Sequence, residues 1–147
     1  MGGPVRDNQP EKVGTAVLSG RVLDAETGKP LRRALVRALS PDTPQGRSVS
    51  TDADGRWRLK GLPAASYRIS ISKGGFVEIS YGQKRPFEGG KVLDVADGQT
   101  IEKLDVSLPR AGVITGQVLD EFGEPVTGAR VSAMRSRYVG GQRRLFP

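Results

Sequence analysis

The sequence predicts an all-β fold, an antiparallel seven-stranded Greek-key β-sandwich that is followed by an incomplete second β module. Three observations predict it. Short runs alternate apolar and polar residues, turn signals rich in Gly, Pro and Asp separate these runs, and no stretch has the period of a helix. Many short strands at such spacing are typical of a sandwich.

The stretch 51–71 shows this pattern most clearly. The segment Asp52-Ala53-Asp54-Gly55 supplies carboxylates that can cap a turn and a glycine that tolerates positive φ. In the strand that follows, Trp57 alternates with charged residues. The segment Gly61-Leu62-Pro63 is expected to end this strand, and a second alternating strand begins at Tyr67. We therefore expect two neighbouring strands, with Trp57 and Tyr67 in the core.

Further strands are expected on both sides of this stretch. They cover residues 15–23, 31–38, 47–51, 76–81, 91–95 and 100–108, with a loop at 40–46 and the longest irregular segment at 82–90. In 76–81, Val77, Ile79 and Tyr81 alternate with Phe76, Glu78 and Ser80. Gly20 predicts a bulge or a close backbone approach in the first strand, and a change of register is expected near Lys103.

An internal repeat divides the chain. Ser19-Gly20-Arg21-Val22-Leu23-Asp24 recurs as Thr115-Gly116-Gln117-Val118-Leu119-Asp120, and Gly28-Lys29-Pro30-Leu31 recurs as Gly123-Glu124-Pro125-Val126. The predicted domains are a flexible leader at 1–14, the sandwich at 15–109, and at 110–147 a linker with the truncated first strands of a second repeat. Since two or three strands cannot bury a sandwich face, we expect 113–147 to be poorly packed, to dock on the first unit, or to belong to a domain completed elsewhere.

The composition excludes several kinds of chemistry. The 147 residues include no cysteine and no histidine. Disulfides, thiolate catalysis, Cys or His metal sites and Ser-His-Asp catalysis are therefore excluded. The composition leaves Ser-Lys and carboxylate chemistry open. We nevertheless expect a protein that is not an enzyme and that has no catalytic residue, metal or cofactor.

The formal charge of +7 raises the question of an acidic partner. Lys and Arg minus Asp and Glu give 0 for 1–16, +4 for 17–60, +1 for 61–110 and +2 for 111–147. This even spread favours a solvated basic face, keeps glycans or acidic surfaces as candidate partners, and argues against nucleic acid. No apolar run is long enough for a membrane span, and 1–10 has no signal-peptide pattern.

The loop 81–90 holds the candidate ligand-binding residues. It is rich in Gly and polar residues, and long loops on rigid scaffolds often carry binding sites. The candidates are Tyr81, Lys84, Arg85 and Phe87.

Two motifs resemble the carboxypeptidase regulatory-like domain, a prealbumin-like (transthyretin-like) β-sandwich. One is Ser19-Gly20-Arg21-Val22-Leu23-Asp24 followed by Gly28-Lys29-Pro30-Leu31. The other is Thr51-Asp52-Ala53-Asp54-Gly55-Arg56-Trp57-Arg58-Leu59 followed by Gly61-Leu62-Pro63 and Tyr67. The resemblance covers one complete copy and the start of a second. It implies a periplasmic, cell-surface or secreted location and no catalysis by the domain itself.

We therefore expect a non-catalytic module of a tandem array, acting as a structural spacer, stabilising or adhesion unit of a larger secreted or cell-envelope protein. Its expected partners are the neighbouring domains of a longer chain. Two alternatives are a carbohydrate-binding accessory module that uses loop 81–90 and an amino-terminal extension of an outer-membrane receptor.

Overall fold

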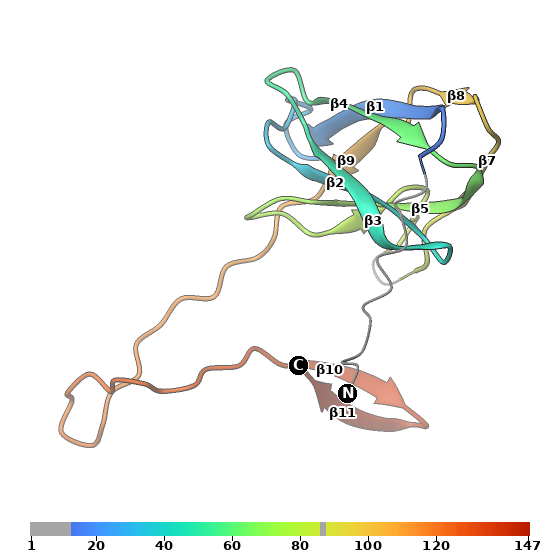
Figure 1. Cartoon of the computed structure of the whole chain (residues 1–147). Helices are drawn as coiled ribbons and strands as arrows, with labels where there is room; N and C mark the ends of the chain where they lie inside the picture. The colour runs from blue at the N-terminus through green and yellow to red at the C-terminus, as the bar shows by residue number, and fades with distance from the viewer. Residues whose placement is uncertain (1–12, 86–87) are drawn as a thin grey trace, which may run out of the picture. The chain divides into compact units, whose positions relative to one another are not determined.

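Two β-sheets face each other in the first unit of the chain (Figure 1). The structure is a computed structural model that describes residues 13–85 and 88–147, and it divides into two units, Met1–Gly112 and Val113–Pro147. The predicted leader at 1–14 therefore lies outside the described residues, except for Val13 and Gly14. In the part of the chain that is described, no helix is long and apolar enough to cross a membrane.

The strands of the first unit fill seven positions. The first sheet has the order β4 (Arg56–Leu62), β1 (Ala16–Asp24) and then β8 (Thr100–Ile101), with β9 (Val106–Leu108) also paired to β1. The second has the order β3 (Thr43–Ser50), β2 (Leu35–Ser40), β5 (Ala65–Ser72), and β5 then pairs with both β6 (Ile79–Ser80) and β7 (Val92–Val95). Because β8 and β9 share one edge of β1, and β6 and β7 share one edge of β5, the predicted seven-stranded sandwich is confirmed.

One detail of the pairing differs from the expectation. β8 and β9 run parallel to β1, whereas the other pairs are antiparallel. The chain reaches β8 by a crossover from the second sheet and not by a hairpin, and a crossover allows parallel pairing.

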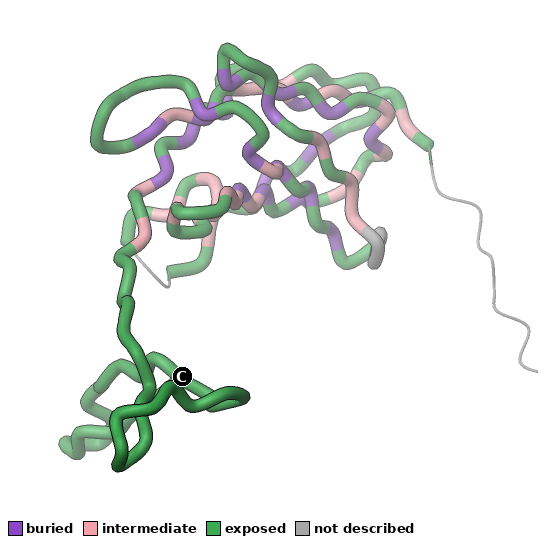
Figure 2. The backbone as a smooth tube through the Cα atoms, turned by 90° about the vertical axis from the view of Figure 1, so that its left-hand side faces the viewer, coloured by how far each residue is buried: buried purple, intermediate pink, exposed green. Residues whose placement is uncertain are grey.

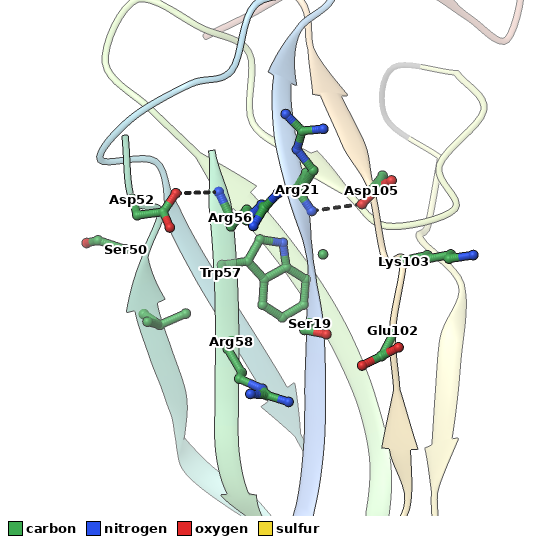
Figure 3. A pocket seen from close by; sticks show the side chains of 12 residues that line it. Ser19, Arg21, Ser50, Asp52, Arg56, Trp57, Arg58, Glu102, Lys103 and Asp105 are labelled. Atoms are coloured by element: carbon green, nitrogen blue, oxygen red, sulfur yellow. Dashed lines mark hydrogen bonds between the residues drawn. The ribbon is translucent and has the colours of Figure 1, made fainter. Parts of the chain in front are cut away.

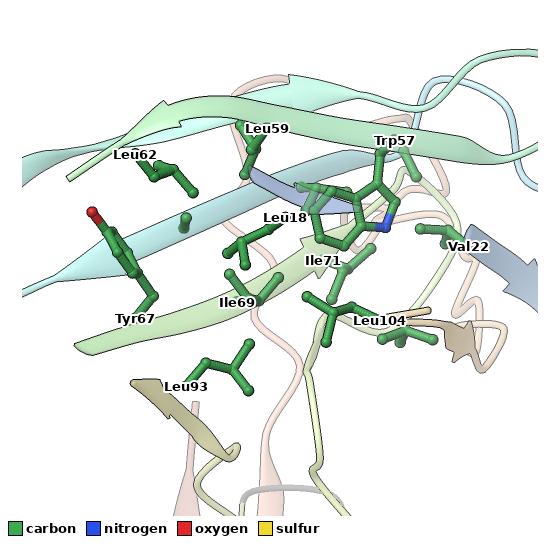
Figure 4. Packing of buried hydrophobic residues seen from close by; sticks show 14 of the residues in the cluster. Leu18, Val22, Trp57, Leu59, Leu62, Tyr67, Ile69, Ile71, Leu93 and Leu104 are labelled. Atoms are coloured by element: carbon green, nitrogen blue, oxygen red, sulfur yellow. The ribbon is translucent and has the colours of Figure 1, made fainter. Parts of the chain in front are cut away.

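The core lies between the sheets, as Figure 4 shows. Trp57 and Tyr67, which the alternation placed inside, are 3% and 1% exposed. The Tyr67 hydroxyl donates a hydrogen bond to the carbonyl of Pro63 at 2.8 Å, and burial raises the pKa of this tyrosine. Both residues are therefore core residues, as predicted.

Four expected element boundaries are wrong. β4 continues through Gly61 to Leu62, because a bulge with Gly61 at φ 69° keeps Leu62 buried. The strand ends there, directly before Pro63. β3 starts at Thr43, inside the expected loop 40–46. The expected strand 31–38 begins only at Leu35, since Arg33 has φ 56°. The expected strand 76–81 is reduced to β6, with Val77 39% exposed while Phe76 packs against the core.

Gly20 lies in the middle of β1, with Trp57 of β4 paired on one edge and the backbone of Leu104 close to the other edge. A Cβ atom at this position would overlap the carbonyl oxygen of Leu104, whose amide donates a hydrogen bond to the carbonyl of Ser19 at 3.0 Å. The predicted close approach is confirmed. Lys103, the residue before Leu104, has φ 60°. This kink lies between β8 and β9 and is the irregularity expected near Lys103.

The chain leaves the sandwich through a fixed connection. The Val77 amide donates to the Pro109 carbonyl at 2.8 Å, and the Ala111 amide donates to the Gly75 carbonyl at 2.9 Å. Between them, the Arg110 guanidinium donates two hydrogen bonds to Oδ2 of Asp24, at 2.9 and 3.2 Å, and lies 5.9 Å from the ring centroid of Phe76.

Asp24 is the buried partner of this ion pair, with 3% exposure. Burial by itself raises the pKa of the Asp24 carboxyl. The amides of Glu26 and Thr27, which donate to Oδ1, and the Arg110 guanidinium outweigh burial and hold the pKa below its usual value. The hydrogen bonds that Arg110 donates to Asp24 raise the pKa of the Arg110 guanidinium.

The second unit repeats the local geometry of the first. The amide of Leu31 donates to the carbonyl of Val22 at 2.9 Å, and that of Val126 donates to the carbonyl of Val118 at 3.0 Å. The isolated bridge Leu23↔Pro30 likewise recurs as Leu119↔Pro125. The two strands of the second unit are β10 (Arg135–Val139) and β11 (Gln142–Phe146), which form a hairpin.

Residues 113–147, which form the second unit, are exposed throughout (Figure 2). Ile114 is 87% exposed, whereas its counterpart Leu18 is completely buried, and Val131 is 77% exposed, whereas its counterpart Val36 is completely buried. In the first unit these counterparts lie in β1 and β2, which belong to different sheets and pair with β4 and β5. Residues 113–147 contain no strand that takes the place of β4 or β5 among those described.

We expect Gly20→Ala to lower the free energy of unfolding by about 1–3 kcal/mol, because the added methyl group forces β1 and Leu104 apart. Urea unfolding followed by the fluorescence of Trp57, the only tryptophan, measures this. Gly74→Ala is the matched control, since a Cβ there meets nothing within 4 Å, and it should change stability by less than about 0.5 kcal/mol. Equal effects of the two substitutions would contradict the close approach.

Arg110→Gln should destabilise the sandwich at neutral pH and much less in acid. The folded-state pKa of Asp24 is lowered, so its contribution to stability is present above the unfolded-state pKa of about 4 and is lost as pH falls through the folded-state value. Thermal unfolding of the wild type and the variant between pH 7 and pH 2 checks this. Arg58→Gln, at an exposed position of β4, is the control. A stability difference that does not shrink in acid would refute the role of the ion pair.

Backbone amides of β1 should exchange with deuterium at least about a hundredfold more slowly than those of the counterpart segment 112–120, because only β1 has strands on both edges. Hydrogen exchange with mass spectrometry on the whole chain measures both. The similar sequences of the two segments provide a built-in control for intrinsic exchange rates. Equal protection would show that the second unit is as well packed as the first.

Candidate binding surfaces

The predicted loop 81–90 keeps some of its candidate residues at the surface. Lys84 and Arg85 are exposed, whereas Tyr81 is half-buried and packs against the core. Phe87 lies outside the described residues. The loop is held by Gln83, whose side-chain oxygen accepts from the Ser80 amide at 3.0 Å and whose side-chain nitrogen donates to the Arg85 carbonyl at 2.8 Å. Glycan binding by these four residues stays a prediction, with Lys84 and Arg85 as its accessible cations.

A second surface, which the sequence did not predict, is an open hollow of about 560 Å³ at the first sheet (Figure 3). Three segments provide most of its polar lining. The middle of β1 contributes Ser19 and Arg21, β4 contributes Arg56 and Arg58, and the kinked segment between β8 and β9 contributes Glu102, Lys103 and Asp105. Val49, Ser50, Asp52, Gly20 and Trp57 complete the lining.

Two of the carboxylates in the hollow accept hydrogen bonds from backbone amides. Oδ1 of Asp105 accepts a hydrogen bond from the Arg21 amide at 2.8 Å, at the edge of β1 between its pairing with β8 and its pairing with β9. Oδ1 of Asp52 accepts from the amides of Asp54 and Arg56, both at 2.9 Å, which confirms the predicted turn. These oxygens are therefore occupied by structural hydrogen bonds. The hollow also contains the carboxylate of Glu102, and its four cationic side chains outnumber its three carboxylates, which favours a polar or anionic ligand.

The buried indole of Trp57 adds one unusual feature. Its Nε1 is the one buried side-chain N or O atom, among the described residues, that has no hydrogen-bond partner. Figure 4 shows the ring inside the sandwich, between the two sheets. The indole thus contributes mainly to packing. No group of three or more Asp and Glu residues that could hold a metal ion occurs in the described part of the chain.

Sequence reasoning missed the hollow because its residues come from distant segments that only the sheet brings together. Ser19 lies on β1, and Glu102 directly follows β8, which pairs with β1 in parallel. The alternation of polar and apolar residues does not reveal such pairing partners. The positive φ of Lys103 is the one part that left a signal, through the irregular alternation in 100–108.

The first unit of the chain matches a known protein family. The sequence model of the carboxypeptidase regulatory-like domain matches residues 17–109. The TonB-dependent transporter Oar of Myxococcus xanthus is 27% identical over 113 residues, which are 77% of this chain and 10% of that protein. The chain thus spans about a tenth of the length of this curated relative.

Among solved structures, a putative carbohydrate binding protein from Bacteroides uniformis is 14% identical, with a TM-score of 0.46 and coverage of 86% of this chain and 49% of that one. The TIE protein of Bacillus anthracis is 19% identical, with a TM-score of 0.46 and coverage of 80% and 24%. Likeness at this level carries no argument about function. By the match over residues 17–109, the chain belongs to the carboxypeptidase regulatory-like domain family.

Proposed function

We propose that the chain is a non-catalytic β-sandwich module of a tandem array, which acts as a structural spacer, stabilising or adhesion unit in a larger secreted or cell-envelope protein. The observation that carries this proposal is the repeat. The turn after the first strand is built twice with the same backbone hydrogen bond, from the Leu31 amide to the Val22 carbonyl and again from the Val126 amide to the Val118 carbonyl. Repetition of one unit with a short connection is typical of arrays whose function is mechanical or spatial.

The connection at residues 109–111 supports the role of a spacer. A spacer transmits position only if the chain leaves each module in a defined direction. Two backbone hydrogen bonds and the Arg110–Asp24 ion pair hold this exit segment on the sandwich. Their combined effect is to prevent free rotation of the chain before Gly112.

The absence of histidine and cysteine from the sequence supports the non-catalytic part of the proposal. In the hollow, the carboxylates of Asp52 and Asp105 accept hydrogen bonds from backbone amides, which favours a structural role over general acid-base catalysis.

A cell-envelope location is favoured by the match to the TonB-dependent transporter Oar. The same match favours a second candidate function, an amino-terminal extension of an outer-membrane receptor. In both cases the partners of the sandwich are neighbouring domains of a longer chain.

An antibody raised against residues 15–109 should detect a polypeptide much longer than 147 residues, in the envelope or secreted fraction of cells that carry the native gene. Immunoblots of the cytosolic, envelope and secreted fractions check this, with a cytosolic marker protein as the control for lysis. A signal confined to the cytosol would overturn the proposed location. Transport that stops when residues 17–109 are deleted in frame, while the remaining protein still reaches the envelope, would favour the receptor extension over the spacer.

A further inference from the structure

The hairpin of the second unit concentrates positive charge. Residues 135–147 contain four arginines, at 135, 137, 143 and 144, and no acidic residue, so this segment carries +4 of the formal charge of +7. The count over 111–147 is only +2, because the acidic residues at 120, 121 and 124 offset it. A count over the whole segment therefore hides a basic hairpin.

Strand pairing brings three of the four arginines onto one face of the hairpin, the arginine face, which Arg135, Arg137 and Arg144 form. Arg137 lies directly opposite Arg144, and Arg135 lies two residues along β10 on the same face. Like charges at opposite positions destabilise a strand pair. Gly140 and Gly141, with φ 60° and 77°, fix this register, since a two-residue turn with both φ angles positive is the type that suits a hairpin. An anion between the two guanidinium groups would relieve their repulsion.

Apolar side chains lie on both faces of the hairpin. Phe146 shares the arginine face, whereas Tyr138 and Leu145 lie with Arg143 on the other face. Tyr138 is 79% exposed and lies opposite Arg143, and Leu145 is 65% exposed. The Arg137 guanidinium lies 6.0 Å from the ring centroid of Phe146. Arginines bind phosphate oxygens through paired N–H groups, while exposed aromatic and aliphatic groups favour the boundary between headgroups and acyl chains.

We propose that the β10–β11 hairpin binds the phosphate headgroups of an anionic lipid surface. Binding of phosphate groups follows from the arginine face alone, and the choice of a lipid surface rests in addition on the proposed cell-envelope location. The exposed apolar groups favour this choice over nucleic acid, as does the confinement of the basic cluster to two five-residue strands. A nucleic-acid site would need a longer basic track.

Co-sedimentation of the full chain with vesicles tests the proposal. The chain should sediment with vesicles of phosphatidylglycerol and phosphatidylcholine, should not do so with phosphatidylcholine alone, and should dissociate as salt is raised. Each basic residue at an anionic surface contributes about fivefold in affinity, so R137Q/R144Q, which removes the facing pair, should bind about thirtyfold more weakly. The matched control is R37Q/R68Q, a double substitution at exposed positions of β2 and β5 outside both candidate surfaces, which should bind like the wild type.

Three results would overturn the proposal. They are unchanged binding by R137Q/R144Q, an equal loss with R37Q/R68Q, and tighter binding of a DNA duplex than of the anionic vesicles at the same salt concentration. Hydrogen exchange of the unmodified chain provides a test that needs no variant: vesicles should slow exchange in 135–146, and slowing confined to the sandwich would also overturn the proposal. Since these measurements use purified chain and defined lipids, their failure is distinguishable from a failure of the proposed cellular location.

Discussion

Strand β1 holds the first sheet together, because it pairs with β4 on one edge and with β8 and β9 on the other. The second edge is available only because Gly20 has no side chain, so that the backbone at Leu104 can approach and donate a hydrogen bond to Ser19. The kink at Lys103 lets the last segment of the first unit pair with β1 as two short strands, β8 and β9. The core between the sheets depends on this contact, since Leu104 is itself a buried core residue.

The same end of the sandwich controls how the chain leaves it. Asp24, the last residue of β1, uses one carboxylate oxygen to cap the following turn and the other to bind Arg110. One buried carboxylate therefore links the turn, the end of the first unit and, through Arg110, the ring of Phe76. This arrangement explains how a surface connection can be fixed with few contacts.

The second unit shows what a local sequence motif can build without partner strands. Its turn forms the same backbone hydrogen bonds as the turn of the first unit, because these depend on residues close in the sequence. Its apolar side chains stay exposed, because burial in the first unit requires β4 and β5, which come from the stretch 51–71. The basic hairpin that follows adds a different chemistry, in which pairing across a short turn places arginines face to face.

By itself, the sequence determined the sandwich class, the inward positions of Trp57 and Tyr67, the Asp52 turn and the break near Lys103, because alternation and turn chemistry act within a few residues. Only the tertiary structure decided which strands are parallel, where β3 and β6 begin, and that Phe76 packs inward in place of Val77. It also decided the hollow beside β1, the Arg110–Asp24 pair and the facing arginines of the hairpin. Each of these depends on pairing or contact between separate segments, and the pattern along one strand contains no information about its neighbours.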